Sequence, residues 1–227
     1  MNPLVDVLPD QVPNTARLPS PVSRRAPMIA TVFVIVLAAV SWSYRWGGPI
    51  DLRYDAGVYY VLGTSLATNG EYRILAEPGA PEGIQYPPGL PALVALHQWA
   101  LGTTDPVVVG PWLKRTYALL FVVFAVALLR LSCAYLGTGW GTVASVLCLV
   151  QLNTVYFSNL LFTELPYTLV SVGLALTLAN QWMNARWWRR EPAGFALVAA
   201  GFLLRTAGLA LMAAWVAEAL WRRQWRL

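Results

Sequence analysis

Two carboxylates and three tyrosines are close together in DLRYDAGVYY, residues 51–60, which follows the first long apolar run almost at once. Asp51 and Asp55 are four residues apart, about one turn of a helix. If the apolar run crosses a bilayer, both carboxylates lie just outside the hydrocarbon, at the depth of a lipid head group. Asp55 is therefore a candidate general base or cation ligand at the boundary between lipid and water.

Each of these two acids also has a simpler structural role. Asp55 stands where an amphipathic helix would begin, and a carboxylate there accepts unpaired N–H groups and complements the helix dipole. That role is compatible with catalysis, because a helix start also fixes the position of the carboxylate. For Asp51 the simplest role is an ion pair with Arg53 or Arg45.

A third candidate acid, Glu164, begins a later apolar run in the sequence TELPY. Thr163 can cap a helix there, Glu164 suits the first turn, and Pro166 is tolerated in it. An acid this close to the apolar phase is nevertheless costly, which favours a functional role. Both interpretations stay open.

Three cations at or inside apolar runs are candidates for binding a lipid phosphate. Lys114 and Arg115 open one run, and Arg205 interrupts another. Cations at the depth of the head groups form strong charge-assisted hydrogen bonds with phosphate. The alternatives are that the long side chains snorkel to the interface, or that Lys114 or Arg115 pairs with Asp105.

The remaining candidates are aromatic. Tyr59 and Tyr86 are candidate substrate-binding residues, although packing at the membrane interface is the simpler role for them and for Tyr60. His97 is the only histidine, and we expect it to be structural within a short interfacial helix.

Composition indicates that these residues are carried by an all-α integral membrane protein. The chain is 57% hydrophobic and 12% charged, whereas soluble domains carry about 25% charged residues. The net charge of +5 does not indicate nucleic-acid binding, because the arginines lie beside apolar runs, where they orient helices in a bilayer. The sequence also contains no Cys/His metal-ligand spacing, no P-loop and no GxGxxG motif.

The start of the chain predicts its orientation in the membrane. Residues 1–27 are rich in proline and polar, and we expect a disordered cytoplasmic tail. Residues 28–44 form the first predicted span. Arg17, Arg24 and Arg25 precede it, so the positive-inside rule leaves the N-terminus in the cytoplasm. The predicted location is the cell membrane, with several passes.

Residues 45–111 are predicted to form a long first outer loop that carries interfacial helices. An amphipathic helix is expected from Tyr54 to Thr68, ended by Asn69–Gly70. Residues 71–85 are polar. The apolar piece from Leu90 to Leu101 is too short to span, so it lies in the interface or re-enters the membrane.

The rest of the chain is predicted to complete a helical bundle of about five or six membrane helices. The expected elements are spans at 112–136, 142–158 and 163–182, a tight turn at 137–141, a basic inner loop with Arg186, Arg189 and Arg190, and a last apolar stretch at 193–221. That stretch is either one helix, which buries Arg205 in the membrane, or a hairpin with Arg205 in its outer turn. We favour the hairpin, because it also leaves Arg222, Arg223 and Arg226 inside.

This topology alone brings Asp51, Asp55, Glu164 and, with the hairpin, Arg205 to the same outer side. The motifs that carry these residues are, in order, YDAGVYYVLGTSLATNGEYR, QYPPGLP, FTELPY and LLRTAG. From about residue 28 to the C-terminus they resemble the N-terminal half of the GT-C superfamily of membrane glycosyltransferases. The likeness is greatest to the protein O-mannosyltransferase and aminoarabinose-transferase-like branch.

The resemblance assigns roles to individual residues. Asp55 matches the catalytic acid of the family, while Ala56 stands where a second acid is usual and Tyr86 where lysine is frequent. Glu164 matches an acid at the start of a later span. Arg205 matches the arginine of a Leu-Thr-Arg turn.

The resemblance also implies a reaction. A sugar moves from polyprenyl phosphate to a hydroxyl of a lipid, glycan or protein acceptor on the outer face, with inversion and with Asp55 as base. Arg205, with Lys114 or Arg115, stabilises the leaving phosphate; Glu164 orients the site or helps to hold a divalent cation, which some relatives need. Asp51, Tyr59 and Tyr86 complete the candidate substrate site.

Two other classes of function are considered. Family members usually have more spans, so this chain would be a truncated product, one half of a split enzyme completed by a second chain, or a scaffold that binds lipid without turnover. A small transporter would place ionisable residues deep inside its spans. Here nearly all stand at span ends, which disfavours transport.

Overall fold

The computed structural model describes residues 25–43, 49–183 and 191–224 of the chain, and these form helices and no named strand. The helices are α1 (Arg25–Ser43), α2 (Asp55–Asn69), α3 (Gly89–Leu101), α4 (Pro106–Val150), α5 (Leu152–Asn159), α6 (Glu164–Met183), α7 (Glu191–Leu204) and α8 (Gly208–Gln224). The predicted all-α architecture is therefore confirmed.

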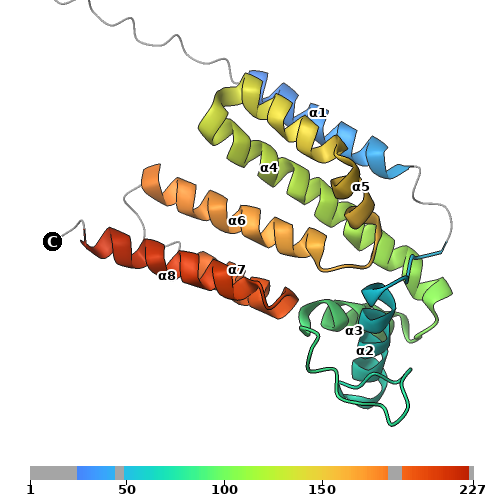
Figure 1. Cartoon of the computed structure of the whole chain (residues 1–227). Helices are drawn as coiled ribbons and strands as arrows, with labels where there is room; N and C mark the ends of the chain where they lie inside the picture. The colour runs from blue at the N-terminus through green and yellow to red at the C-terminus, as the bar shows by residue number, and fades with distance from the viewer. Residues whose placement is uncertain (1–24, 44–48, 184–190, 225–227) are drawn as a thin grey trace, which may run out of the picture.

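The described helices fall into two regions (Figure 1). The bundle consists of α1, α4, α5, α6, α7 and α8, whose long members run side by side in the order α1, α4, α6, α7, α8. The cap consists of residues 49–105, with α2 and α3 packed together at one end of the bundle. The cap takes up most of the predicted outer loop, but residues 106–111 of that loop already belong to α4.

A reversal inside α4 forms the predicted tight turn. Gly137 leaves the helical conformation with φ 73° and ψ 171°, and the chain turns back on itself (Figure 1). Positive φ is easily adopted only by glycine. Gly141 lets the two limbs approach closely, since a Cβ there would lie 2.7 Å from the Cα of Cys133.

The prediction that residues 142–158 form one continuous span is wrong. The chain breaks at Gln151, which has φ −59° and ψ 134°, and then forms the short helix α5. The extended conformation of Gln151 cannot continue the hydrogen-bond ladder of a helix.

The last apolar stretch forms the predicted hairpin, so the single-helix alternative is wrong. α7 ends at Leu204 and α8 begins at Gly208, with Arg205 in the turn between them. The two helices touch closely at the turn, where a Cβ on Gly208 would overlap the backbone of Gly201 and Phe202.

Different elements lie at the two ends of the bundle. Figure 1 places the start of α1, the reversal within α4 and the last turns of α6 and α8 at one end; the cap, α5 and the turn between α7 and α8 lie at the other. The candidate acids and Arg205 therefore belong to a single end, as the alternating topology predicted.

Two predictions concern residues at the margins. Arg25 to Pro27 form the first turn of α1, so the end of the predicted disordered tail is helical. The rest of that tail, with Arg17 and Arg24, and the basic inner loop with Arg186, Arg189 and Arg190 lie outside the described residues.

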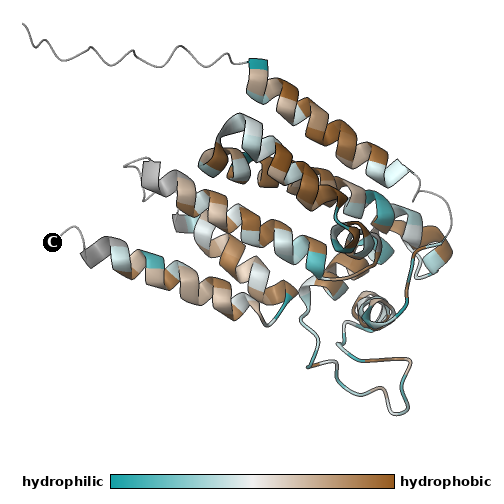
Figure 2. Ribbon diagram, turned by 45° about the horizontal axis from the view of Figure 1, so that its top comes forward, coloured by the Kyte–Doolittle hydropathy of each residue, from teal (hydrophilic) through white to brown (hydrophobic). Residues whose placement is uncertain are grey.

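By length and composition, two of the described helices can cross a bilayer, namely α1 and α4. Three further apolar stretches are shorter: Glu164–Ala179, Pro192–Leu204 and Gly208–Trp221. The expected five or six membrane helices are therefore not shown. Only 22% of the apolar window in each of α1 and α4 is buried, and apolar residues cover much of the bundle's ribbon (Figure 2).

The buried residues of the cap belong to the same hydrophobic core as those of the bundle, and the two helices of the cap agree with the predicted elements. Val94 of α3 packs so closely on α2 that a Cβ on Gly63 would lie 2.7 Å from it. Gly70 and Gly102 end the two helices in the left-handed conformation. The predicted structural role of His97 is confirmed, because its Nε2 lies 2.8 Å from Oγ1 of Thr116 on α4.

Candidate functional site

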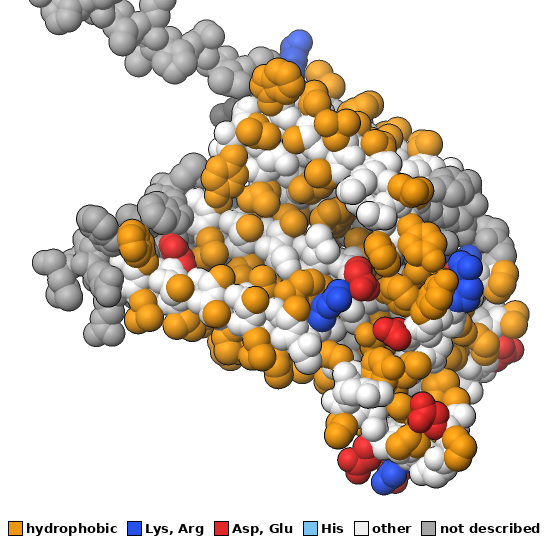
Figure 3. Space-filling model, in the orientation of Figure 1, with side chains coloured by type: hydrophobic (Ala, Val, Ile, Leu, Met, Phe, Trp, Pro, Cys, Tyr) orange, Lys and Arg blue, Asp and Glu red, His pale blue; other side chains and the backbone are white. Residues whose placement is uncertain are grey.

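The candidate site lies where the cap meets the end of the bundle. It combines the segment that leads into α2, the first turns of α4, the segment before α6 and the turn between α7 and α8. In Figure 3, charged side chains gather on the cap and beside it, while most of the visible bundle surface is hydrophobic.

Three contacts fix the segment before α6 and the first turn of α6. Asp51 and Leu160 form an isolated parallel β-bridge. The buried hydroxyl of Tyr117 donates a 2.6 Å hydrogen bond to the carbonyl of Phe162. The hydroxyl of Tyr167 donates at 3.1 Å to the carbonyl of Ala207 in the α7–α8 turn. These bonds join the starts of α2 and α6 to that turn.

Glu164 and Arg205, 41 positions apart in the sequence, form an ion pair. Nη1 of Arg205 lies 3.1 Å from Oε1 of Glu164, and the side chains are 45% and 33% exposed. An exposed pair of this kind contributes about 0–1 kcal/mol to stability. A guanidinium has five N–H donors, so this single contact leaves donors for another anion.

Asp51 pairs with Arg53, which was the simplest role expected for it. Nη2 of Arg53 lies 2.6 Å from Oδ2, and its Nε lies 2.9 Å from Oδ1. This pairing with Arg53 holds the pKa of Asp51 below its usual value, and Lys114 adds to the effect. The same contact raises the pKa of Arg53. Asp51 is therefore a charged, oriented group that is already engaged.

Asp55 is an exposed carboxylate at the first position of α2. Within the described part of the chain, its carboxylate has no hydrogen bond or ion pair to another side chain or to the helix N-terminus. Tyr54, which precedes it, has φ 58° and ψ −138°. A bulky residue at positive φ is strained, and such strain is concentrated at functional sites.

Tyr59 lies within the electrostatic field of Asp55 and Glu164. Its side chain is buried, and its ring meets that of Tyr86 edge to face, with 5.6 Å between centroids. Burial raises the pKa of Tyr59, and the negative charges of Asp55 and Glu164 add to the rise. Its hydroxyl therefore stays protonated and can donate a hydrogen bond within the field of both acids.

Two of the three cations predicted to bind phosphate, Lys114 and Arg115, face different directions on α4. Lys114 is buried and interacts electrostatically with Asp51. Arg115 points to the exposed face, where its guanidinium lies 4.4 Å from the ring centroid of Trp112. Asp105 caps α4 by accepting a 2.9 Å hydrogen bond from the N–H of Val107. Lys114 thus belongs to the site, whereas no contact brings Arg115 to it.

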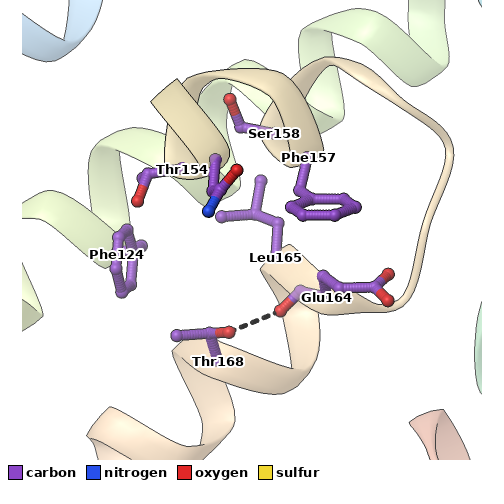
Figure 4. A pocket seen from close by; sticks show the side chains of 8 residues that line it. Phe124, Thr154, Phe157, Ser158, Glu164, Leu165 and Thr168 are labelled. Atoms are coloured by element: carbon purple, nitrogen blue, oxygen red, sulfur yellow. Dashed lines mark hydrogen bonds between the residues drawn. The ribbon is translucent and has the colours of Figure 1, made fainter. Parts of the chain in front are cut away.

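A half-open cavity of about 210 Å³ lies beside Glu164, between α4, α5 and the start of α6 (Figure 4). Its other lining residues are Phe124, Asn153, Thr154, Phe157, Ser158, Leu165 and Thr168. None of these was singled out from the sequence. The signal was present, since the polar residues of QLNT and FSN interrupt an otherwise apolar stretch.

The expected divalent cation has no preformed set of donors in the described residues. No three side chains of His, Cys, Asp or Glu come together there. The carboxylates of Asp51 and Glu164 are each engaged by an arginine instead.

Comparisons of the chain with protein-family models, with curated proteins and with solved structures find no match.

Proposed function

We propose that the chain is a multi-pass membrane protein of the GT-C type that transfers a sugar from a polyprenyl-phosphate donor to a hydroxyl acceptor. The observation that carries this proposal is the convergence of four distant segments at one end of the bundle. They bring together Asp51, Asp55, Lys114, Glu164 and Arg205, and Tyr59 interacts electrostatically with Asp55, Glu164 and Arg205.

Exposed apolar side chains support the membrane setting. Met28, Ile29 and Phe33 on α1 are more than half exposed, as is Leu119 on α4. Contiguous apolar surface of this kind is rare in soluble monomers but is required where the solvent is lipid. In this setting, with a cytoplasmic N-terminus, the cap and the site face the outside.

Asp55 is proposed as the general base. Its exposed carboxylate accepts the proton of the acceptor hydroxyl while that oxygen bonds to the anomeric carbon. The bond from the anomeric carbon to the phosphate oxygen breaks, and polyprenyl phosphate leaves with the electron pair, so that the sugar is inverted. A positioned base typically accelerates a reaction by about 10²–10⁴-fold.

The cations of the site stabilise the charge that develops on the leaving phosphate. Glu164 orients Arg205 through Nη1, and the other donors of the guanidinium bind the phosphate. Lys114 adds a second positive charge from the first turns of α4. Tyr86 is partly exposed and packs edge to face on the buried Tyr59, so its ring is the aromatic surface on which the sugar can pack.

The decisive variant is Asp55→Asn, which removes the base but keeps the shape of the side chain. We expect unchanged binding of a labelled polyprenyl-phosphate sugar to the purified protein and a loss of transfer of about 10²-fold or more. Glu77→Gln, at an exposed acid in the loop of the cap, is the matched control and should retain full transfer. Unchanged transfer by Asp55→Asn would remove Asp55 from this role.

A scaffold that binds lipid without turnover is the second candidate. The observation that favours it is that both Asp51 and Glu164 are engaged by arginines, as in a structural ion-pair network. Binding of the labelled donor without transfer by the unaltered protein, with every acceptor class supplied, would establish this alternative.

A further inference from the structure

The cavity beside Glu164 has features that the proposed reaction does not use. It lies next to a break in the helical backbone, because α4 stops at Val150, Gln151 is extended and α5 follows. Within a membrane, irregular backbone is tolerated where it is buried in protein or lines a cavity. In a membrane, the break at Gln151 is therefore expected to line this cavity rather than to face lipid.

The lining has two kinds of surface. Phe124, Phe157 and Leu165 form apolar walls, and Leu165 stands in the middle of the group in Figure 4. Three hydroxyls and one amide lie among them, contributed by Thr154, Ser158, Thr168 and Asn153. A ligand with an apolar body and a small hydrogen-bonding group matches this combination.

Charge limits the nature of that group. No lysine, arginine or histidine lines the cavity, and the one ionisable lining residue is Glu164. In Figure 4 its carboxylate extends beneath Phe157, away from Phe124. Arg205 pairs with this carboxylate at 3.1 Å and does not line the cavity, so a phosphate inside it would meet no cation of the lining. The lining therefore favours a neutral group.

The volume of the cavity further limits which ligand it can hold. Pockets that enclose whole ligands measure about 300–1,000 Å³, so a cavity of about 210 Å³ holds only part of a lipid. A glycerol backbone with one free hydroxyl has a suitable size. Its chains would then lie outside, against the apolar faces of the bundle.

We propose that this cavity binds the hydroxyl-bearing head of a neutral lipid of the diacylglycerol type. Thr154 and Asn153 at the helix break hydrogen-bond the hydroxyl and ester oxygens, while Phe124, Phe157 and Leu165 contact the apolar part. The cavity shares Glu164 with the proposed phosphate site, but its occupation does not depend on sugar transfer.

The test uses the whole chain in nanodiscs of phosphatidylcholine, without any sugar donor. The probes are a diacylglycerol with a photoreactive acyl chain and a phosphatidic acid with the same chains. We expect diacylglycerol to label residues 152–168 at least several-fold more than phosphatidic acid does. Equal labelling by both probes, or no labelling of this segment, would overturn the proposal.

Variants then test the lining itself. Thr154→Val removes one hydroxyl and should reduce the diacylglycerol labelling about fivefold, the effect of losing one neutral hydrogen bond. Leu165→Phe fills the cavity and should abolish the labelling. Thr31→Val on α1 is the matched control and should change nothing. If Leu165→Phe does not fold, the test depends on Thr154→Val. Diacylglycerol labelling of Thr154→Val equal to that of the unaltered protein would refute the proposal.

Discussion

The cap and the bundle differ in what their helices expose. In the cap, α2 exposes polar residues at its end and buries Ala56, Tyr59, Leu62 and Ser65. In the bundle, α1 buries only one stripe, formed by Ala30, Val34, Ala38 and Trp42. The other faces of α1 expose large apolar side chains. A soluble core would attract these side chains inward, because burying one contributes about 1.5–3 kcal/mol. The difference is what the proposed membrane setting predicts, because the exposed apolar side chains of the bundle would then face lipid.

The cap is not uniform in this respect. The outward face of α3 carries Leu96 and Trp99, which are 56% and 74% exposed. α3 thus resembles the bundle helices on one side while its other side packs on α2. This pattern agrees with a helix at the membrane interface, with Trp at the level of the head groups.

The largest expected effect contrasts one exposed apolar residue from each region. Val123→Lys places a charge on the outer face of α4 and should cost about 2.5–3.5 kcal/mol in membrane insertion. Ile84→Lys, at an even more exposed position in the cap, should change stability by less than about 0.5 kcal/mol. Translocon insertion and thermal unfolding measure these two effects. Equal tolerance of both charges would mean that α4 does not face lipid.

The next effect concerns the close approach of the limbs of α4. Gly141→Ala forces its Cβ against the backbone of Cys133 and should destabilise the bundle by about 1–3 kcal/mol. Gly139→Ala meets no atom within 4 Å and should stabilise the helix by about 0.5–1 kcal/mol. Thermal unfolding in detergent distinguishes them. The same sign for both variants would refute the packed reversal.

A smaller effect should appear in the cap at alkaline pH. Burial raises the pKa of Tyr59 and Tyr60, and it raises that of Tyr72 to about 12. The unfolded chain then loses these protons more readily than the folded cap. The stability they contribute is complete below pH 10 and decreases as the pH rises toward 12. Tyrosinate absorbance and circular dichroism should follow this loss, and Tyr72→Phe should lessen it.

The smallest expected effect is at acid pH, at the junction of the two regions. Arg53 holds the pKa of Asp51 below its unfolded value, so the stability from this group is present above that unfolded pKa. It is lost as the pH falls through the lower folded pKa. Asp51→Asn should remove this part of the acid response. An unaltered acid titration of stability in Asp51→Asn would mean that the pair contributes nothing.

Several elements could be predicted because their signals are local. Asn69–Gly70 ends α2, the glycine at 137 reverses α4, and the RTAG sequence at 205–208 separates α7 from α8. Glycine at positive φ or in close helix contact has few substitutes, so its position is informative. The break at Gln151 carries no such residue and was missed.

The candidate site was predictable in part. Glu164 and Arg205 were expected at one end of the bundle, and they form an ion pair there. Tyr117 was not expected, because a tyrosine inside an apolar run shows no pattern that predicts its hydrogen bond to Phe162. Adjacent residues of a helix always point about 100° apart, but that Lys114 rather than Arg115 faces the interior was not predicted, because it depends on which face of α4 meets its partners.

The hydropathy and glycine pattern alone therefore specified most of the helices, the turns marked by glycine and the common end of the candidate acids, because each depends on residues close together in the chain. Whether Glu164 meets Arg205, which of Lys114 and Arg115 is buried and where a cavity opens depended on packing between segments far apart in the chain; Glu164 and Arg205 are 41 positions apart. Such contacts are set by side-chain shape and charge in three dimensions, and hydropathy order carries no information about them.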